Sequence, residues 1–223
     1  MNRRLQRDTA TMTSEEMSSL GVYYHYDEAD ISSGTALIFG PADTPYANCP
    51  LFFSVKVPKD YPFTSPTVIM LTSDGLTRFH PNLYVNGKVC LSILGTYSGP
   101  SWASTLNIGS VFKSIVSLLD KNPITNEPGW ESYEESHPAA KAYAEWVEYH
   151  LVQHTLNQYR LYKEGKNPIW SKFAEVIDEV WPAHLQKIGE RVKAKSDEPM
   201  KKYTSIPYGM HGMIRWKDLS ARL

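Results

Sequence analysis

The stretch that decides the fold is TALIFGPADTPYANCPLFFSVKV, residues 35–57, in which two apolar runs flank a turn rich in Gly, Pro and Asp. The runs at 35–39 and 51–57 are rich in β-branched and aromatic residues, which is typical of strands. Comparable runs at 22–26 and 67–71 lie on either side, separated by short polar or Gly/Pro links. Such links favour pairing between consecutive strands, so the pattern predicts a four-stranded antiparallel meander with one face to be covered.

A central helix is predicted to provide that cover. Apolar residues recur at i, i+3, i+4 and i+7 from Ile108 to Leu119, and Asn122-Pro123 should end the helix. Between the sheet and this helix, residues 73–104 are irregular and carry several Gly and Pro residues. A long irregular segment is usually a functional loop. We therefore expect an α+β fold whose site lies in this segment.

Beyond residue 137 the pattern is helical. A long helix is expected to reach about residue 163, and Asn167-Pro168 should open another helix as its cap and first residue. Pro182 is expected to kink or split that second helix. Residues 201–223 leave two alternatives, a docked tail with one short helix or a partly disordered tail.

Composition limits the class of partner. The 223 residues carry 23 Lys and Arg against 24 Asp and Glu, a net charge of -1, which favours neither nucleic acid nor a membrane surface. Two cysteines are too few for a disulfide scaffold and suit a reducing compartment. The sequence shows neither a signal segment at its start nor a membrane-spanning run, so we expect a soluble protein of the cytoplasm, the nucleus or both. The seven histidines show no metal-ligand spacing with cysteines, and no metal site is expected.

The candidate site centres on Cys90 in the run YVNGKVCLS, residues 84–92. A lone cysteine is more often a small buried apolar residue than a reactive one. Here, however, His80-Pro81-Asn82 lies just upstream, with Asn82 eight positions before the cysteine. These residues place a thiol, an amide side chain and a rigid turn in one short loop, which indicates thiol chemistry.

Together with neighbouring runs, this loop resembles the ubiquitin-conjugating enzymes. The markers occur in the family's order and spacing: GPADTPY (40–46), DYPFTSP (60–66), HPN (80–82) and NGKVCL (86–91). The run CLSILGT, the Ser98-Gly99-Pro100 insertion and the helical pattern past residue 163 are most similar to the large Z-type branch of that family. The resemblance implies the family's UBC-like fold, with an N-terminal helix before the sheet.

The resemblance also suggests how the chain is divided. The likeness runs from Arg3 to about residue 163. We therefore predict a core domain at residues 1–163 and a C-terminal helical extension at residues 164–223, packed on the core.

The resemblance implies that Cys90 accepts ubiquitin or a ubiquitin-like modifier from an activating enzyme as a thioester. The modifier then passes to a lysine of a protein substrate, usually with a ubiquitin ligase. A thiolate attacks an acyl group readily, yet the thioester keeps enough energy to acylate an amine. Asn82 would stabilise the oxyanion of that step or hold the loop in place. No cofactor is implied for this chain, because ATP is used by the activating enzyme upstream.

Other residues complete the implied site. His80 and Pro81 are given a structural role, in which the imidazole bonds the loop backbone rather than the cysteine. An acid beside the site would pair with the lysine ammonium and accept its proton; Glu127 is the candidate and Asn126 the alternative, while a merely solvated loop acid fits equally well. The position two residues after the cysteine, often acidic in the family, is Ser92 here.

Docking surfaces are implied as well. Phe63, on a loop stiffened by Pro62, is the expected contact for ligases and the activating enzyme, unless its ring folds back onto the core. Trp102 and Ser104 belong to the partner loop, which lacks the family's usual proline. Two residues of the central helix lie off its apolar stripe, on the face expected to meet the donor modifier: Lys113 and Ser117.

Two other functions stay open at this point. A Cys-His hydrolase would use Cys90 and His80, but no third orienting residue is evident. A non-catalytic binding module is the second alternative, although the inactive variants of the family lack the cysteine that this chain keeps.

Overall fold

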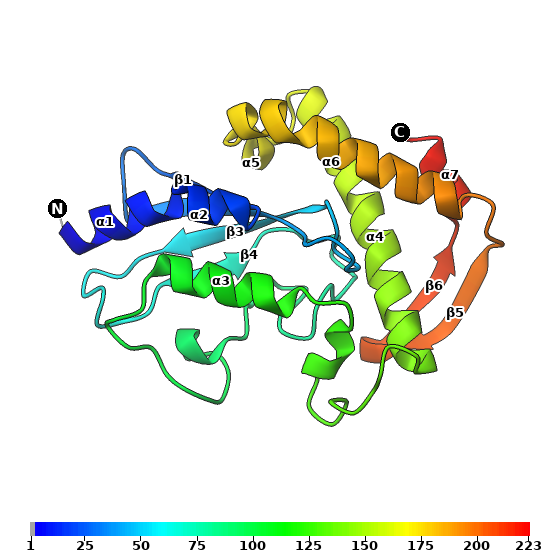
Figure 1. The fold of residues 1–223 in the computed structure, drawn as a ribbon, viewed down its shortest axis with the longest axis horizontal. Helices are drawn as coiled ribbons and strands as arrows, with labels where there is room; N and C mark the ends of the chain where they lie inside the picture. Colours follow the sequence, from blue (N-terminus) through cyan, green and yellow to red (C-terminus); the bar gives the residue numbers. More distant parts are fainter. Residues whose placement is uncertain (1–2) are drawn as a thin grey trace.

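The computed structural model describes residues 3–223, and a four-stranded antiparallel sheet lies at its centre. Its strands follow one another in sequence order: β1 (Val22–Tyr26), β2 (Ser33–Phe39), β3 (Pro50–Lys56) and β4 (Thr67–Met70). The register places Ala36 opposite Phe53, and Phe53 opposite Met70. The predicted meander and its α+β class are therefore confirmed (Figure 1).

Both faces of the sheet are covered. Successive side chains of a strand point to opposite faces, so neighbouring residues of one strand pack against different parts of the chain. Phe53 packs edge-on against Phe112 of α3 (Ile108–Leu118), with 5.9 Å between ring centroids. Its neighbour Phe52 packs instead against Phe173, in the C-terminal extension, at 5.7 Å. Burial on both faces explains why the third strand reads as a continuous apolar run rather than an alternating one.

The predicted central helix is α3, and local chemistry fixes where it starts. The Asn107 side chain accepts a hydrogen bond from the Ser110 N–H, and the Ser110 hydroxyl accepts one from the Asn107 N–H. This reciprocal cap satisfies two backbone donors that the first turn leaves free. The N-terminal helices α1 (Arg3–Met12) and α2 (Glu15–Ser19) lie beside β1, and α1 also contacts α3.

A long helix, α4 (Pro138–Lys163), joins the sheet region to the extension, residues 164–223 (Figure 1). After it come α5 (Pro168–Ser171) and α6 (Ala174–Lys195). Trp181 of α6 is 2% exposed and stacks on Phe39 at the end of β2. The His184 ring also stacks on Phe39, with centroids 4.0 Å apart. The extension is thus packed on the sheet through aromatic rings.

One expectation for the extension is wrong. Pro182 does not split the helix: α6 runs through it without a break, and the division falls earlier, at residues 172–173. Pro182 and Asp178 are both exposed. Water can therefore satisfy the Asp178 carbonyl, which loses its helical partner because proline has no N–H.

Residues 201–223 form a docked tail with one short helix, the first of the two alternatives, but the sequence did not predict the structure of residues 201–214. They form a hairpin of β5 (Lys201–Ile206) and β6 (Met210–Ile214), joined by a one-turn 3-10 segment, η3 (Pro207–Gly209). A short helix, α7 (Trp216–Ser220), follows. The hairpin lies alongside α4, on the right of Figure 1.

The boundary proposed at residue 163 stays a prediction. The helix α4 ends there, at Lys163. Within residues 3–223, none of the helices has the length and apolar character needed to cross a membrane.

Candidate active site

The turn at His80-Pro81-Asn82 is held by its own histidine. Nδ1 of His80 accepts a hydrogen bond of 2.9 Å from the Asn82 N–H, and the His80 carbonyl accepts one from the Leu83 N–H. His80 is fully buried, and burial is the main cause that lowers its pKa to about 3. The ring is therefore neutral near pH 7, and Nδ1 is already engaged.

Asn82 is bonded to the cysteine residue at both its backbone and its side chain. The Cys90 N–H donates to the Asn82 carbonyl at 2.8 Å, and Nδ2 of Asn82 donates to the Cys90 carbonyl at 2.9 Å. The amide nitrogen carries two hydrogens, so one donor is left after this bond. Cys90 itself is 3% exposed, just below the surface. The predicted partners are thus adjacent, with one amide N–H available beside the thiol-bearing residue.

Thr96 is a residue that the sequence reasoning missed. Its hydroxyl donates to the Val89 carbonyl at 2.7 Å and accepts from the Leu91 N–H at 3.0 Å. It therefore ties together the two residues that flank Cys90. A left-handed turn at Gly95, with φ 69°, brings the chain back so that this contact can form. No local pattern signals it, because the contact depends on how the loop folds.

Ser92 begins a short 3-10 helix, η1 (Ser92–Leu94), immediately after the site. A Cβ added at Gly99 would lie 3.0 Å from the Ser92 Cβ, so the Ser98-Gly99-Pro100 insertion passes directly over this residue. In this chain, the position two residues after the cysteine is therefore packed against the insertion, and Ser92 supplies no charge there.

Glu127 follows a second 3-10 helix, η2 (Pro123–Asn126). Its Oε2 accepts a hydrogen bond of 2.7 Å from the hydroxyl of Tyr208, which belongs to the extension. The alternative residue, Asn126, bonds locally: its Nδ2 donates to the Pro123 carbonyl at 3.2 Å. The position of Glu127 is therefore set by a residue far away in the sequence, whereas Asn126 bonds within its own turn.

Asp120 is a second acid that the sequence reasoning passed over. It lies just after α3 and is partly buried, and burial is the first cause that raises its pKa. Its Oδ1 accepts the Asn122 N–H at 2.9 Å. Asp120 therefore supports the loop that leads to Glu127.

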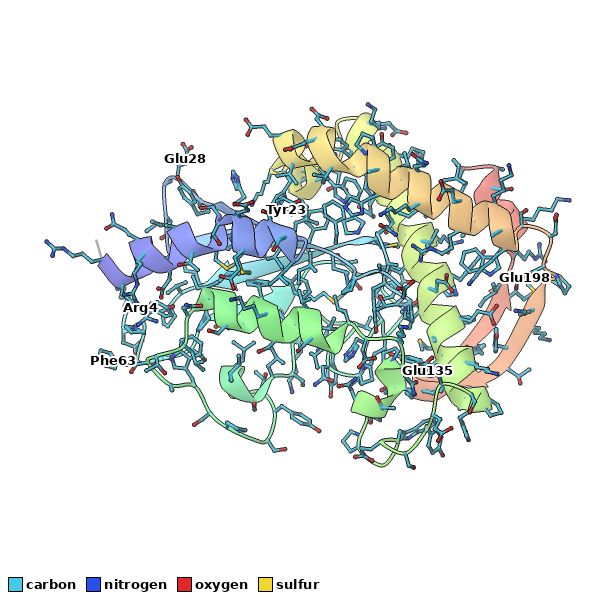
Figure 2. The ribbon with its side chains drawn as sticks, in the orientation of Figure 1. Arg4, Tyr23, Glu28, Phe63, Glu135 and Glu198 are labelled. Carbon is cyan, nitrogen blue, oxygen red and sulfur yellow. The ribbon has the colours of Figure 1, made fainter. Side chains whose placement is uncertain are left out.

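The proposed docking residues lie at the opposite end of the molecule from the hairpin. Phe63 is 81% exposed and points outward at the left edge of Figure 2, so its ring does not fold back onto the core. The indole N–H of Trp102 donates to the Pro62 carbonyl at 2.7 Å, and the Ser104 carbonyl accepts from Arg4 at 2.9 Å. These bonds join the two loops and α1 into one surface.

The two residues assigned to the donor-modifier face are exposed on α3. Lys113 forms an ion pair with Glu16 of α2, and the Ser117 hydroxyl donates to the Ser114 carbonyl at 2.8 Å. Both side chains are therefore on the surface, but they already have partners.

The second thiol, that of Cys49, does not belong to this site. Cys49 is fully buried, and burial raises the pKa of its thiol to about 11. Among residues 3–223, no three His, Cys, Asp or Glu side chains are grouped so that they could hold a metal ion.

Fold and site together define a class, α+β proteins with one thiol-bearing loop beside a meander sheet. A family model described as ubiquitin-conjugating enzyme matches residues 4–150. The chain belongs to the ubiquitin-conjugating enzyme family.

Named relatives agree with this assignment. Human "Ubiquitin-conjugating enzyme E2 Z" is 42% identical over 152 residues, which cover 67% of this chain and 42% of that protein. "Probable ubiquitin-conjugating enzyme protein 17" of Caenorhabditis elegans is 35% identical over 230 residues, 96% of this chain and 30% of its own length. The predicted likeness to the Z-type branch is thus confirmed, and the second match extends into the extension.

A further relative is much larger. The human "Dual E2 ubiquitin-conjugating enzyme/E3 ubiquitin-protein ligase BIRC6" is 43% identical over 137 residues, 58% of this chain and 3% of that protein. This chain spans less than half the length of each of the three relatives.

Proposed function

We propose that this protein accepts ubiquitin or a ubiquitin-like modifier on Cys90 and transfers it to lysine. The observation that carries the proposal is the paired hydrogen bonding of Asn82 and Cys90, in a chain that belongs to the conjugating family. These hydrogen bonds fix the backbone of Cys90 and place an amide donor next to the residue that carries the sulfur.

In the first step, the Cys90 thiolate attacks the carbonyl carbon of the modifier's C-terminal thioester on the activating enzyme. A new carbon–sulfur bond forms at Cys90, the old one breaks, and the thiolate of the activating enzyme leaves. ATP is consumed before this exchange, by the activating enzyme, and this chain needs no cofactor of its own.

In the second step, a lysine amine attacks the thioester on Cys90. The carbon–nitrogen bond forms, the carbon–sulfur bond breaks, and the Cys90 sulfur leaves and takes up the proton that the attacking nitrogen loses as the amide forms. The free N–H of Asn82 stabilises the oxyanion that develops on the carbonyl oxygen. Glu127 pairs with the incoming ammonium and takes its proton before attack.

The partners follow from this sequence of steps. They are the modifier, an activating enzyme, a ubiquitin ligase and protein substrates. Phe63 and Trp102, on one exposed surface with Pro62 and Ser104, form the docking site for the ligase and the activating enzyme. Lys113 and Ser117 contact the donor modifier. Both cysteines are free, which supports a place in the cytoplasm, the nucleus or both.

A hydrolase is the weaker alternative. His80 would have to act as the base for Cys90, but Nδ1 is used by the Asn82 N–H, and the pKa of the ring is lowered to about 3. A base with so low a pKa removes a thiol proton poorly near neutral pH. An inert binding module is also disfavoured, because the chain keeps Cys90 and Asn82 together.

The test is incubation of the protein with activating enzyme, ATP and each candidate modifier. We expect a reducible adduct of the modifier that is lost in C90A. A folded protein that forms no adduct with any pair of modifier and activating enzyme contradicts the proposal. Cleavage of a ubiquitin-peptide substrate without ATP would favour the hydrolase instead.

A further inference from the structure

Tyr208 stands in an unusual backbone conformation at the tip of the C-terminal hairpin. Its φ is 68° and its ψ 22°, in the left-handed region, which a bulky residue rarely adopts. Such a conformation is strained and persists only where the surroundings hold it. Pro207 and Gly209 on either side make the tight turn that presents the ring.

The turn presents the Tyr208 ring to the loop of the active site. The Arg78 guanidinium lies 4.4 Å from the centre of the Tyr208 ring, and Tyr143 of α4 packs edge-on against it at 5.8 Å. The Tyr208 hydroxyl donates to Oε2 of Glu127 at 2.7 Å. The ring is therefore fixed from two sides, and its hydroxyl has one defined acceptor.

Arg78 connects this contact to the His80-Pro81-Asn82 turn. Its Nη2 donates to the Pro81 carbonyl, next to Asn82. Its own backbone is held by the extension and by α4, because its N–H contacts Met210 Sδ at 3.4 Å and its carbonyl accepts from the Tyr143 hydroxyl at 2.8 Å. One arginine thus links the hairpin, α4 and the turn that carries the amide donor.

The hydrogen bond between Tyr208 and Glu127 can hold Glu127 in place as a proton acceptor. Burial is the main cause that raises the pKa of Tyr208, so its hydroxyl stays protonated and acts as the donor. The bond engages only Oε2, and no other described residue bonds to Oε1 of Glu127. One carboxylate oxygen is held while the other stays available for an ammonium group.

We propose that Tyr208 is a positioning residue for lysine transfer: the extension supplies the hydroxyl that orients Glu127 beside the thioester loop. This inference rests on the function proposed above, in which Glu127 receives the proton of the lysine. It gives the hairpin a direct part in the second step and none in the first. Loss of the hydroxyl should therefore affect transfer to an amine and leave thioester formation intact.

The experiment uses the full chain, loaded on Cys90 with modifier and then separated from ATP. Discharge is followed with free lysine and, in parallel, with a small thiol, which needs no carboxylate to accept its proton. In Y208F, which keeps the ring, we expect charging at the wild-type rate and discharge to lysine about tenfold slower, the effect of losing one hydrogen bond to a charged group. Discharge to the thiol should not change.

The same hairpin offers a matched control. Tyr203 of β5 donates its hydroxyl to Glu145 of α4, a second Tyr–Glu pair, and neither residue belongs to the proposed site. Y203F should discharge to lysine like the wild type. In an E127Q background, Y208F should add no further loss, because the group that it orients is already gone.

The outcomes separate the two proposals. Wild-type protein that never forms a thioester overturns the function and this inference with it. A charged Y208F that transfers to lysine at the wild-type rate overturns the inference alone, as does an equal loss with lysine and thiol. If Y208F does not fold, as judged by circular dichroism, E127Q must itself show the lysine-selective loss, and an E127Q that matches the wild type also overturns it.

Discussion

Asn82 and Cys90 face each other across the active-site loop and exchange two hydrogen bonds. The backbone bond, at 2.8 Å, fixes the distance between the two segments, and the side-chain bond, at 2.9 Å, fixes the orientation of the amide. The arrangement leaves one amide hydrogen free. The Asn82 side chain therefore holds the loop together and is also placed to act on a thioester at Cys90.

This geometry leads to a prediction for N82S. The serine variant should still charge, because thiol exchange depends on Cys90, but its transfer to lysine should slow by about 100-fold, the loss seen when one oxyanion donor is removed. Single-turnover discharge to lysine measures the effect. N86S, which changes an exposed asparagine of the same loop, is the control. Equal discharge rates for N82S and the wild type would remove Asn82 from the mechanism.

The two thiols should differ in reactivity. Burial raises the pKa of Cys49 to about 11, so only about one molecule in a thousand carries its thiolate at pH 8. Alkylation at pH 8, followed by peptide mapping, should therefore modify Cys90 before Cys49, and the order should weaken only as the pH approaches 11. C49A should charge like the wild type. Faster labelling of Cys49 would show that the core around it opens readily.

Stability should fall as the solution is acidified. Because the pKa of His80 is about 3 in the folded protein and near 6.5 when unfolded, only the unfolded chain takes up this proton between those values. The folded state therefore loses about 1.4 kcal/mol per pH unit from this group as the pH falls from 6.5 to 3. Above pH 6.5 the group is neutral in both states and has no effect.

Denaturant unfolding at pH 7 and pH 5 measures this dependence. H80N keeps an acceptor near the position of Nδ1 but cannot titrate, so its stability should change less between the two pH values. H211N, at an exposed histidine, should behave like the wild type. An identical pH dependence in H80N and the wild type would assign the acid sensitivity to other groups.

The aromatic contact between the extension and the sheet should carry much of the stability. Trp181 is 2% exposed and packs on Phe39, so W181A should cost about 3–5 kcal/mol, as large-to-small changes of buried aromatics do. Thermal unfolding should show a fall in Tm of about 10 °C for a chain of this size.

The neighbouring residue provides the comparison. Pro182 is exposed and interrupts the hydrogen bonds of α6, so P182A should leave Tm unchanged or raise it. A W181A variant as stable as P182A would mean that the extension adds little to the fold.

The sheet could be predicted from sequence because its signal is local. Residues 35–39 and 51–57 alternate or run apolar within each strand, and the turn residues stand between them. The hairpin at 201–214 lacks this signal. Its strands carry Lys202 and other exposed residues, and they are stabilised by packing on α4, a contact with no local pattern.

The candidate site also has a part with a local sequence signal and a part that depends on distant contacts. Cys90, Asn82 and His80 lie within one loop, so their spacing was enough to group them, and the structure places them together. The predicted identity of the acid is still untested, but its partner Tyr208 lies 81 positions away. Thr96 escaped notice because a threonine that bridges the backbone groups on either side of Cys90 looks like any other threonine in a sequence.

The rings on α4 have a practical consequence for anyone who expresses a shortened form. Trp146 packs against Tyr203, and Tyr149 against Trp216, with both partners downstream of Lys163. A fragment trimmed to the matched portion, residues 4–150, would leave these indole and phenol surfaces facing solvent. Aggregation during purification should follow, and recombinant work on this enzyme should therefore keep the chain through α7.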